Sequence, residues 1–149
     1  MVDPIDENGK KTDMSVNTLW VVAGALQRPD GQILMHKRPL GKQHGGLWEY
    51  PGGKVEEAEV PVNTLIRELN EELGVQVSAD SCEPVAFAEE RNSGSGRPIV
   101  ILLYKVTEWS GAPTALEGGE VDWFAPRSIL ELQKPPLDED LTDLLLRQV

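Results

Sequence analysis

One predicted helix carries a cluster of acidic residues that constrains the fold more than any other feature of this chain. The segment 67–72 reads R-E-L-N-E-E, and its glutamates are Glu68, Glu71 and Glu72. Residues three and four apart lie on one face of an α-helix. Two like charges about 5 Å apart repel by roughly 3 kcal/mol at an effective dielectric near 20. Such a face needs cations, and carboxylate oxygens suit Mg²⁺ or Mn²⁺. The cluster predicts a divalent-metal site, the alternative being a solvated helix face.

Residues on either side of the cluster predict where this helix begins and ends. Proline suits a first helical turn because its missing N–H would have no partner there, and Pro61 precedes the cluster. Glycine ends a helix readily in the left-handed conformation, and Gly74 follows the cluster. We therefore expect a helix over residues 61–73. Its core-facing residues are expected to be Leu65, Ile66, Leu69 and Leu73.

The helix belongs to a longer pattern of fixed spacing. Residues 53–75 fit G-x5-E-x7-R-E-U-x-E-E-x-G-U at every position, where U is aliphatic. At ordinary residue frequencies, such a match at a given start has a chance probability on the order of 10⁻⁹. The segment resembles the Nudix box, which marks hydrolases of nucleoside diphosphates linked to another group. WEYPGGK just before the box, and an RP pair ten residues upstream of Trp48, resemble MutT-type members. The resemblance covers residues 18–146.

The remaining elements are predicted from apolar, β-branched runs separated by glycine and proline turns. Residues 18–28 and 32–38 are expected to form a hairpin about the turn Pro29-Asp30-Gly31. Other strands are expected at 48–50, 75–77, 84–90, 99–106 and 121–124, with a hairpin loop at 92–97 and helices near 127–132 and 139–147. This order indicates an α+β chain. The resemblance implies the Nudix α/β/α sandwich around a mixed, mostly antiparallel sheet.

Length and composition narrow the setting. The 149 residues predict a polar, poorly ordered tail at 1–16 and a single domain, of Nudix type by the resemblance, at 17–149. A net charge of −11 argues against polymeric nucleic acid, which binds clustered Lys and Arg. A small nucleotide, bound through metal ions, remains a suitable partner. Cys82 is the only cysteine, which favours a reducing cytoplasm. No apolar run approaches the roughly 20 residues that span a bilayer.

The resemblance assigns roles within the box. The implied metal ligands are a backbone carbonyl of the Gly52–Gly53 pair and the carboxylates of Glu68, Glu71 and Glu72. Arg67 would pair with a nearby carboxylate and orient it, the alternative being an ordinary i, i+4 pair with Glu71. Glu59 would support this layer or cap the loop before the helix.

A later loop is expected to complete the metal site. MutT-type enzymes use a glutamate there, and the corresponding loop is residues 116–120. Glu117 matches best in position and Glu120 is the alternative, while a solvated loop acid is the plain interpretation. The implied chemistry is substitution at phosphorus by water. Metal ions neutralise the phosphates and lower the pKa of a bound water, and a carboxylate removes its proton.

Substrate contacts are expected upstream of the box. Arg38 resembles a phosphate-facing arginine, for which a guanidinium is suited, but it is also compatible with an ordinary edge-strand charge. Glu49 and Tyr50 lie beside the glycine pair, where they could contact the nucleoside, and Tyr50 is equally compatible with the core. The two histidines, His36 and His44, have no partner visible in the sequence and receive no role.

The expected base-reading position departs from the family pattern. MutT-type proteins place an asparagine after a Pro-Pro pair, whereas this chain has Asp138 after Pro135-Pro136-Leu137. An ionised aspartate only accepts hydrogen bonds. It could accept one from the N7–H of 8-oxoguanine or from a cytosine amino group, or it could cap the last helix. The resemblance thus implies a pyrophosphohydrolase of 8-oxo-dGTP, with a CTP-type enzyme or a non-hydrolytic nucleotide sensor as alternatives.

Overall fold

A computed structural model describes residues 7–9, 17–91 and 96–148. The tail expected at 1–16, apart from 7–9, and most of the loop expected at 92–97 lie outside the described residues. A four-stranded sheet has the order β4-β1-β6-β5, and a three-stranded sheet has the order β3-β2-β7. The strands are β1 (Leu19–Leu26), β2 (Ile33–Lys37), β3 (Trp48–Glu49), β4 (Gly52–Lys54), β5 (Cys82–Glu89), β6 (Ile99–Val106) and β7 (Glu120–Phe124).

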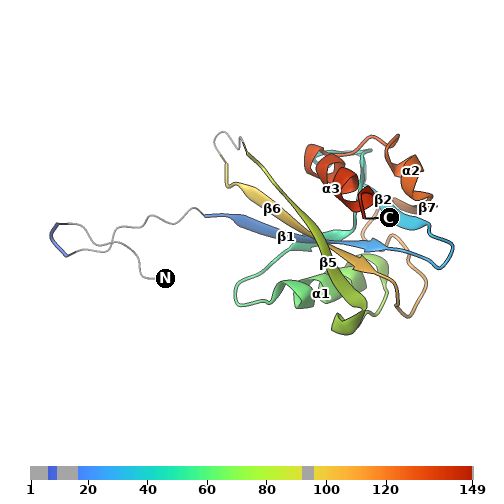
Figure 1. Cartoon of the computed structure of the whole chain (residues 1–149), viewed down its shortest axis with the longest axis horizontal. Helices are drawn as coiled ribbons and strands as arrows, with labels where there is room; N and C mark the ends of the chain where they lie inside the picture. The colour runs from blue at the N-terminus through green and yellow to red at the C-terminus, as the bar shows by residue number, and fades with distance from the viewer. Residues whose placement is uncertain (1–6, 10–16, 92–95, 149) are drawn as a thin grey trace.

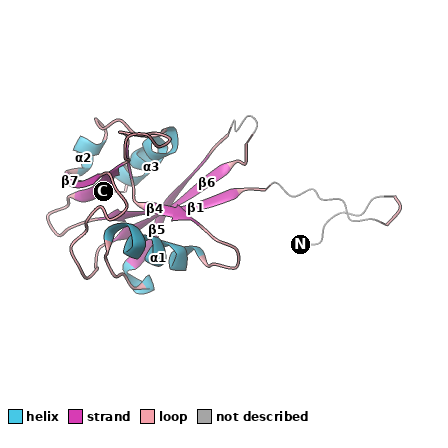
Figure 2. Ribbon diagram, turned by 180° about the vertical axis from the view of Figure 1, so that it is seen from behind, coloured by secondary structure: helices cyan, strands magenta, loops and turns pink. Residues whose placement is uncertain are grey.

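Helices cover the sheets from opposite sides. They are α1 (Pro61–Leu73), α2 (Pro126–Ile129) and α3 (Pro136–Leu146), with a short 3-10 turn at Ala79–Ser81. Figures 1 and 2 show α1 on one side of the strands and α2 with α3 on the other. The pairing of β1 with β6 is parallel and the other ladders are antiparallel. The expected α+β class with a mixed sheet is confirmed. Within the described ranges, no helix is long and apolar enough to cross a membrane.

The central helix α1 matches its predicted bounds. Gly74 ends it in the left-handed conformation, at φ 73°, and donates its N–H to the carbonyl of Asn70. The fully buried leucines Leu65, Leu69 and Leu73 pack with β1 in one of two core clusters. Each such burial stabilises the fold by about 1.5–3 kcal/mol. Ile66, which was also expected to face the core, is only half-buried.

One predicted strand pairing and one predicted strand are wrong. The runs that become β1 and β2 do not form a hairpin ladder, because the edges of β1 are taken by β4 and β6. Only an isolated bridge, Gln27 to Ile33, joins them, and β2 pairs instead with β3 and β7. Residues 75–77 form no strand either, since they make only the bridge of Gln76 to Ser110.

The glycine pair before α1 lies in a strand. Gly52 and Gly53 begin β4, and they pair with Ala23 and Val22 of β1. A Cβ at Gly52 would clash with the carbonyl oxygen of Val22. Glycine is therefore required here for close approach of two backbones, not for an unusual φ angle.

Candidate active site

Two carboxylates of α1 reach the glycine pair. The Glu68 carboxylate lies against Gly53 so closely that any Cβ there would clash with it. The Oε2 of Glu72 accepts a hydrogen bond of 3.1 Å from the N–H of Gly52. The strand β4 and one face of α1 therefore lie in direct contact through these two carboxylates.

Arg67 holds the outer carboxylates. Its Nε and Nη2 donate to the two oxygens of Glu59 at 2.8 and 3.0 Å. Its Nη1 donates to Glu68 at 3.0 Å and to Glu71 at 3.2 Å. Arg67 thus pairs with the nearby carboxylates of Glu59 and Glu68 and also forms the i, i+4 pair with Glu71. The same hydrogen bonds from Arg67, with one from Thr64, lower the pKa of Glu59 to about 2.

Glu59 also closes the loop before α1. Besides pairing with Arg67, its Oε1 accepts from the hydroxyl of Thr64 at 2.7 Å and from the N–H of Glu56 at 3.1 Å. Glu59 therefore performs both functions considered for it, supporting the arginine and capping the loop.

The carboxyl groups of Glu68 and Glu72 have raised pKa values, because the positive charges near them do not offset the effect of burial. Burial raises the pKa of Glu72 to about 8, although the charge of His36 acts in the opposite direction. Burial also raises the pKa of Glu68, and the charges of Glu71 and Glu117 add to the rise against the effect of Arg67. A cation would favour the ionised forms. Carboxylate oxygens are the ligands that a hard divalent cation prefers.

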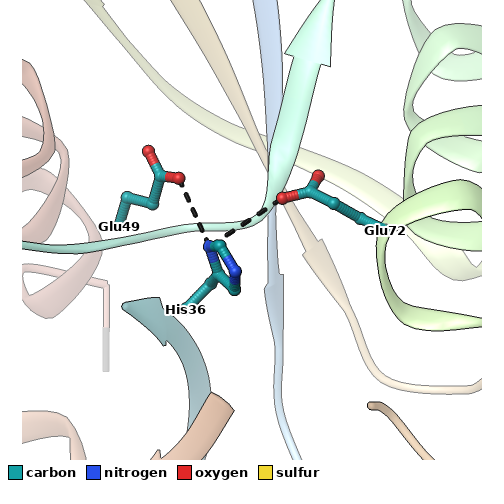
Figure 3. A group of neighbouring side chains, drawn as sticks. All are labelled: His36, Glu49 and Glu72. Carbon is teal, nitrogen blue, oxygen red and sulfur yellow. Dashed lines mark hydrogen bonds and ion pairs between the residues drawn. The ribbon is translucent and has the colours of Figure 1, made fainter. Parts of the chain in front are cut away.

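His36 is the residue that the sequence analysis missed. It lies on β2 and is 6% exposed. Figure 3 shows its ring between Glu49 and Glu72, with Nδ1 at 3.4 and 4.0 Å from their respective Oε1 atoms. The three side chains are close enough to share a cation. Its pKa is raised, chiefly by the hydrogen bond to Glu49. A lone histidine after the fully apolar Ile33–Met35 run was the available signal.

The other ring nitrogen of His36 faces the later loop. Its Nε2 lies 2.9 Å from the carbonyl oxygen of Gly118, to which it donates. That carbonyl belongs to the loop expected to complete the metal site. Glu117 is exposed there and acts electrostatically on Glu68, whereas Glu120 pairs with Lys37 at 3.5 Å. Of these two acids, Glu117 is therefore the one whose charge acts on a box carboxylate, and Glu120 is the one held by a lysine.

Arg38 and Glu49 form a pair beside β3. Nη1 of Arg38 donates to both oxygens of Glu49, at 3.1 and 3.0 Å. Its Nε donates to the carbonyl of Gln43 at 2.7 Å. Arg38 directly follows β2. It thus links the loop that contains Gln43 to Glu49, the carboxylate that also faces His36.

Tyr50 and Asp138 meet at the start of α3. The ring of Tyr50 is 3% exposed and packs in the second core cluster, so the core interpretation of this side chain holds. Asp138 does not cap α3, because Pro135 is the N-cap and no side-chain cap bond is formed. Instead, Oδ1 of Asp138 accepts the N–H of Tyr50 at 3.1 Å. Burial raises the pKa of Asp138 to about 7.

A groove runs along α3, and Asp138 is not among the residues that line it. It has a volume of about 730 Å³ and lies between β5 and α3. Its walls include Phe87 and Ala88 from β5, and Pro136 and Leu137 from the first turn of α3. This volume is within the usual range for small-molecule sites.

Comparisons with known proteins agree on one family. The NUDIX domain model matches residues 18–145. The CTP pyrophosphohydrolase of Escherichia coli (strain K12) is 34% identical over 126 residues, 85% of this chain and 90% of that protein. The 8-oxo-dGTP diphosphatase of Haemophilus influenzae is 33% identical over 136 residues, 91% of this chain and 96% of that protein. The solution structure of the E. coli ORF135 protein has a TM-score of 0.78 at 34% identity, covering 89% and 91% of the two chains.

Proposed function

Because this chain belongs to the Nudix hydrolases, among the MutT-type members, we propose that it is a metal-dependent nucleoside triphosphate pyrophosphohydrolase. It converts a nucleoside triphosphate and water into the monophosphate and pyrophosphate, and its preferred substrate is 8-oxo-dGTP. One observation carries the proposal: the backbone segment 50–52 contacts both Glu72, on the side where the phosphates would bind, and Asp138, on the side where the base would bind. The N–H of Tyr50 bonds to Asp138, and the N–H of Gly52 bonds to Glu72, each at 3.1 Å.

The phosphate end would hold the metal. The residues proposed as ligands are Glu68, Glu71, Glu72, Glu117 and a backbone carbonyl of Gly52 or Gly53. A bound Mg²⁺ or Mn²⁺ would neutralise phosphate charge and lower the pKa of a bound water. Arg67 orients Glu68 and Glu71 through its hydrogen bonds. One of the carboxylates at this end, acting as the general base, would take the proton of the attacking water.

The base end would read the nucleobase with Asp138. Its Oδ1 is engaged by the N–H of Tyr50, so the second oxygen is the one proposed to meet the base. A carboxyl with a pKa of about 7 is partly protonated at neutral pH. The protonated form donates and accepts, as asparagine does, and the ionised form accepts only. The ionised form would accept from the N7–H that 8-oxoguanine has and guanine lacks.

A pyrimidine substrate is the second candidate. Asp138 favours it, because a carboxylate is a recognised acceptor for the cytosine amino group. The 34% identical relative from E. coli is a CTP pyrophosphohydrolase. If 8-oxo-dGTP is preferred, the role would be cleansing of the cytoplasmic nucleotide pool.

Steady-state hydrolysis with Mg²⁺ tests the proposal. The panel is 8-oxo-dGTP, dGTP, CTP, 5-methyl-dCTP and ADP-ribose, with pyrophosphate measured as a product of the triphosphates and AMP as a product of ADP-ribose. A large excess of kcat/KM for 8-oxo-dGTP over dGTP supports the sanitising role. A preference for CTP or 5-methyl-dCTP transfers the assignment to the pyrimidine enzyme, and a preference for ADP-ribose removes both. Binding without metal-dependent turnover would instead indicate a nucleotide sensor.

A further inference from the structure

We propose that His36 is a positioning residue that holds the Glu117 loop against the acidic face of α1. The inference rests on the proposed function, because it gives Glu117 its purpose. The relevant contact is the hydrogen bond from Nε2 of His36 to the carbonyl oxygen of Gly118, one residue beyond Glu117.

The loop is held from two sides. On the helix side, the N–H groups of Thr114 and Leu116 donate to the carbonyls of Leu73 and Glu72, at 3.1 and 3.0 Å. These carbonyls belong to the last turn of α1, where intrahelical donors are missing. On the opposite side, the loop meets β2 through His36. The ladder between β2 and β7 begins only at Glu120, so the histidine is the side chain of β2 that holds the loop backbone at Gly118, before that ladder starts.

The fit on the β2 side is tight. A Cβ at Gly119 would clash with the carbonyl oxygen of Lys37 and would lie 3.0 Å from Nε2 of His36. Gly118 and Gly119 both have positive φ angles, 97° and 78°, a conformation that glycine adopts without strain. A small shift of His36 would thus be transmitted directly to the loop backbone.

Glu117 depends on that backbone. Among the described residues, its side chain forms no hydrogen bond or ion pair, although its charge acts on Glu68. A side chain of this kind is positioned only by its own loop. Releasing the Gly118 carbonyl would therefore misplace Glu117 without altering any contact that Glu117 itself makes.

The Nδ1 side of the ring offers a competing role. His36, Glu49 and Glu72 are close enough to share a cation, with His36 as a nitrogen ligand. However, both oxygens of Glu49 already accept hydrogen bonds from Arg38. The Gly118 contact, at 2.9 Å, is also shorter than the 3.4 Å contact to Glu49. The geometry favours positioning through Nε2 over metal binding through Nδ1.

Two substitutions separate the two nitrogens. The amide nitrogen of a glutamine reaches about as far as Nε2, and that of an asparagine about as far as Nδ1. His36→Gln should keep the donor to Gly118, whereas His36→Asn should lose it. Amide hydrogen exchange of Leu116 and Thr114, followed by NMR without metal or nucleotide, reports the anchoring directly. We expect exchange about tenfold faster in His36→Asn, and within about threefold of the wild type in His36→Gln.

Kinetics provide the second readout. With Mg²⁺ and the preferred nucleotide, we expect kcat to fall in His36→Asn with little change in KM, and to be largely restored in His36→Gln. Glu117→Gln should then cause a smaller loss in the His36→Asn background than alone, because the two residues act as one unit. Gly119→Ala, which disturbs the same contact from the loop side, should reproduce the His36→Asn exchange pattern.

Three results would overturn the proposal. The first is the reverse order, with His36→Asn normal and His36→Gln impaired, and the second is normal exchange in both variants and in Gly119→Ala. The third is nitrogen-14 coupling to bound Mn²⁺ by electron spin-echo modulation, which would make His36 a ligand. A wild-type protein without turnover would contradict the proposed function, whereas the metal-free exchange experiment would still decide the anchoring role.

Discussion

The two ends of the candidate site are held in opposite ways. At the phosphate end, charged groups predominate, and the single side chain of Arg67 forms ion pairs with Glu59, Glu68 and Glu71. At the base end, Asp138 and the ring of Tyr50 are buried and joined by hydrogen bonds to backbone and hydroxyl groups. The carboxylates at the phosphate end are not fully neutralised by nearby positive charges. The polar groups of Asp138 and Tyr50 at the base end, in contrast, have hydrogen-bond partners within the protein. We therefore expect bound metal to control the behaviour of the phosphate end, and we expect pH and core packing to control the stability of the base end.

Removal of a carboxylate at the phosphate end should have the largest effect. Glu72→Gln is expected to lower kcat by on the order of 10²–10³-fold, because several kcal/mol of transition-state charge stabilisation depend on the proposed metal site. Steady-state assays over a Mg²⁺ titration measure it. Glu57→Gln is the matched control, since Glu57 is an exposed acid in the same segment, at a position where the box pattern specifies no residue. Near-normal turnover of Glu72→Gln at saturating Mg²⁺ would contradict the metal assignment.

Neutralising Asp138 should change the pH dependence of stability. The folded protein holds the Asp138 proton up to about pH 7, whereas the ordinary pKa of an aspartate is 3.8. Its contribution is thus complete below about pH 4 and is lost as the pH rises through 7. The slope is at most about 1.4 kcal/mol per pH unit. Asp138→Asn should remove this component, so its unfolding free energy should fall less between pH 4 and 7.

Denaturant unfolding of metal-free protein at several pH values tests this expectation. Asp140→Asn is the matched control, because Asp140 lies on the same helix and is exposed. Equal slopes for wild type and Asp138→Asn would mean that the buried carboxyl does not hold its proton. Glu72 titrates in the same direction, so the comparison between the two proteins isolates Asp138.

Arg67 should affect the phosphate end alone. Arg67→Ala leaves Glu59, Glu68 and Glu71 without their shared partner, and groups that orient metal ligands are typically worth 10–100-fold in metal affinity. We expect Mn²⁺ affinity, measured by calorimetry, to fall in that range. Arg67→Lys should lie between, since lysine keeps the charge but loses the paired contact with Glu59. An unchanged Mn²⁺ affinity in Arg67→Ala would limit this arginine to loop stability.

Sequence reasoning succeeded where signals are local. Pro61 and Gly74 mark the ends of α1, and both are within one turn of the boundary that they define. His36 was missed because its partners Glu49 and Gly118 lie 13 and 82 positions away. The hairpin prediction failed for a related reason: a turn between two strands does not reveal that other strands occupy both edges of β1.

The base end illustrates the same limit. Asp138 could be compared with a family position, but its partner Tyr50 is 88 positions away. Whether the aspartate caps its helix or accepts a distant N–H depends on how α3 packs on the second core. That packing depends on the tertiary arrangement of Tyr50 and Thr142, and no pattern along the chain specifies it.

Substitution of Thr142 should affect the base end alone, and its effect should be smaller than those of the substitutions at Glu72, Asp138 and Arg67. Its buried hydroxyl bonds to the hydroxyl of Tyr50 at 2.7 Å and donates to the carbonyl of Asp138 at 2.8 Å. Thr142→Val keeps the shape but leaves the Tyr50 hydroxyl buried without this partner, which costs about 1–2 kcal/mol. Thr142→Ser, which keeps the hydroxyl, is the matched control for the hydrogen bond.

A double substitution sharpens the comparison between the ends. Removing both hydroxyls in Tyr50→Phe with Thr142→Val should recover much of the loss, because no buried hydroxyl is then left unpaired. Denaturant unfolding gives the coupling free energy, and calorimetry with Mn²⁺ gives the metal affinity of the same proteins. We expect the affinity to be unchanged throughout. A parallel loss of Mn²⁺ affinity would mean that the backbone segment 50–53 couples the two ends, because a disturbance at Tyr50 would then have reached Gly52 and Glu72.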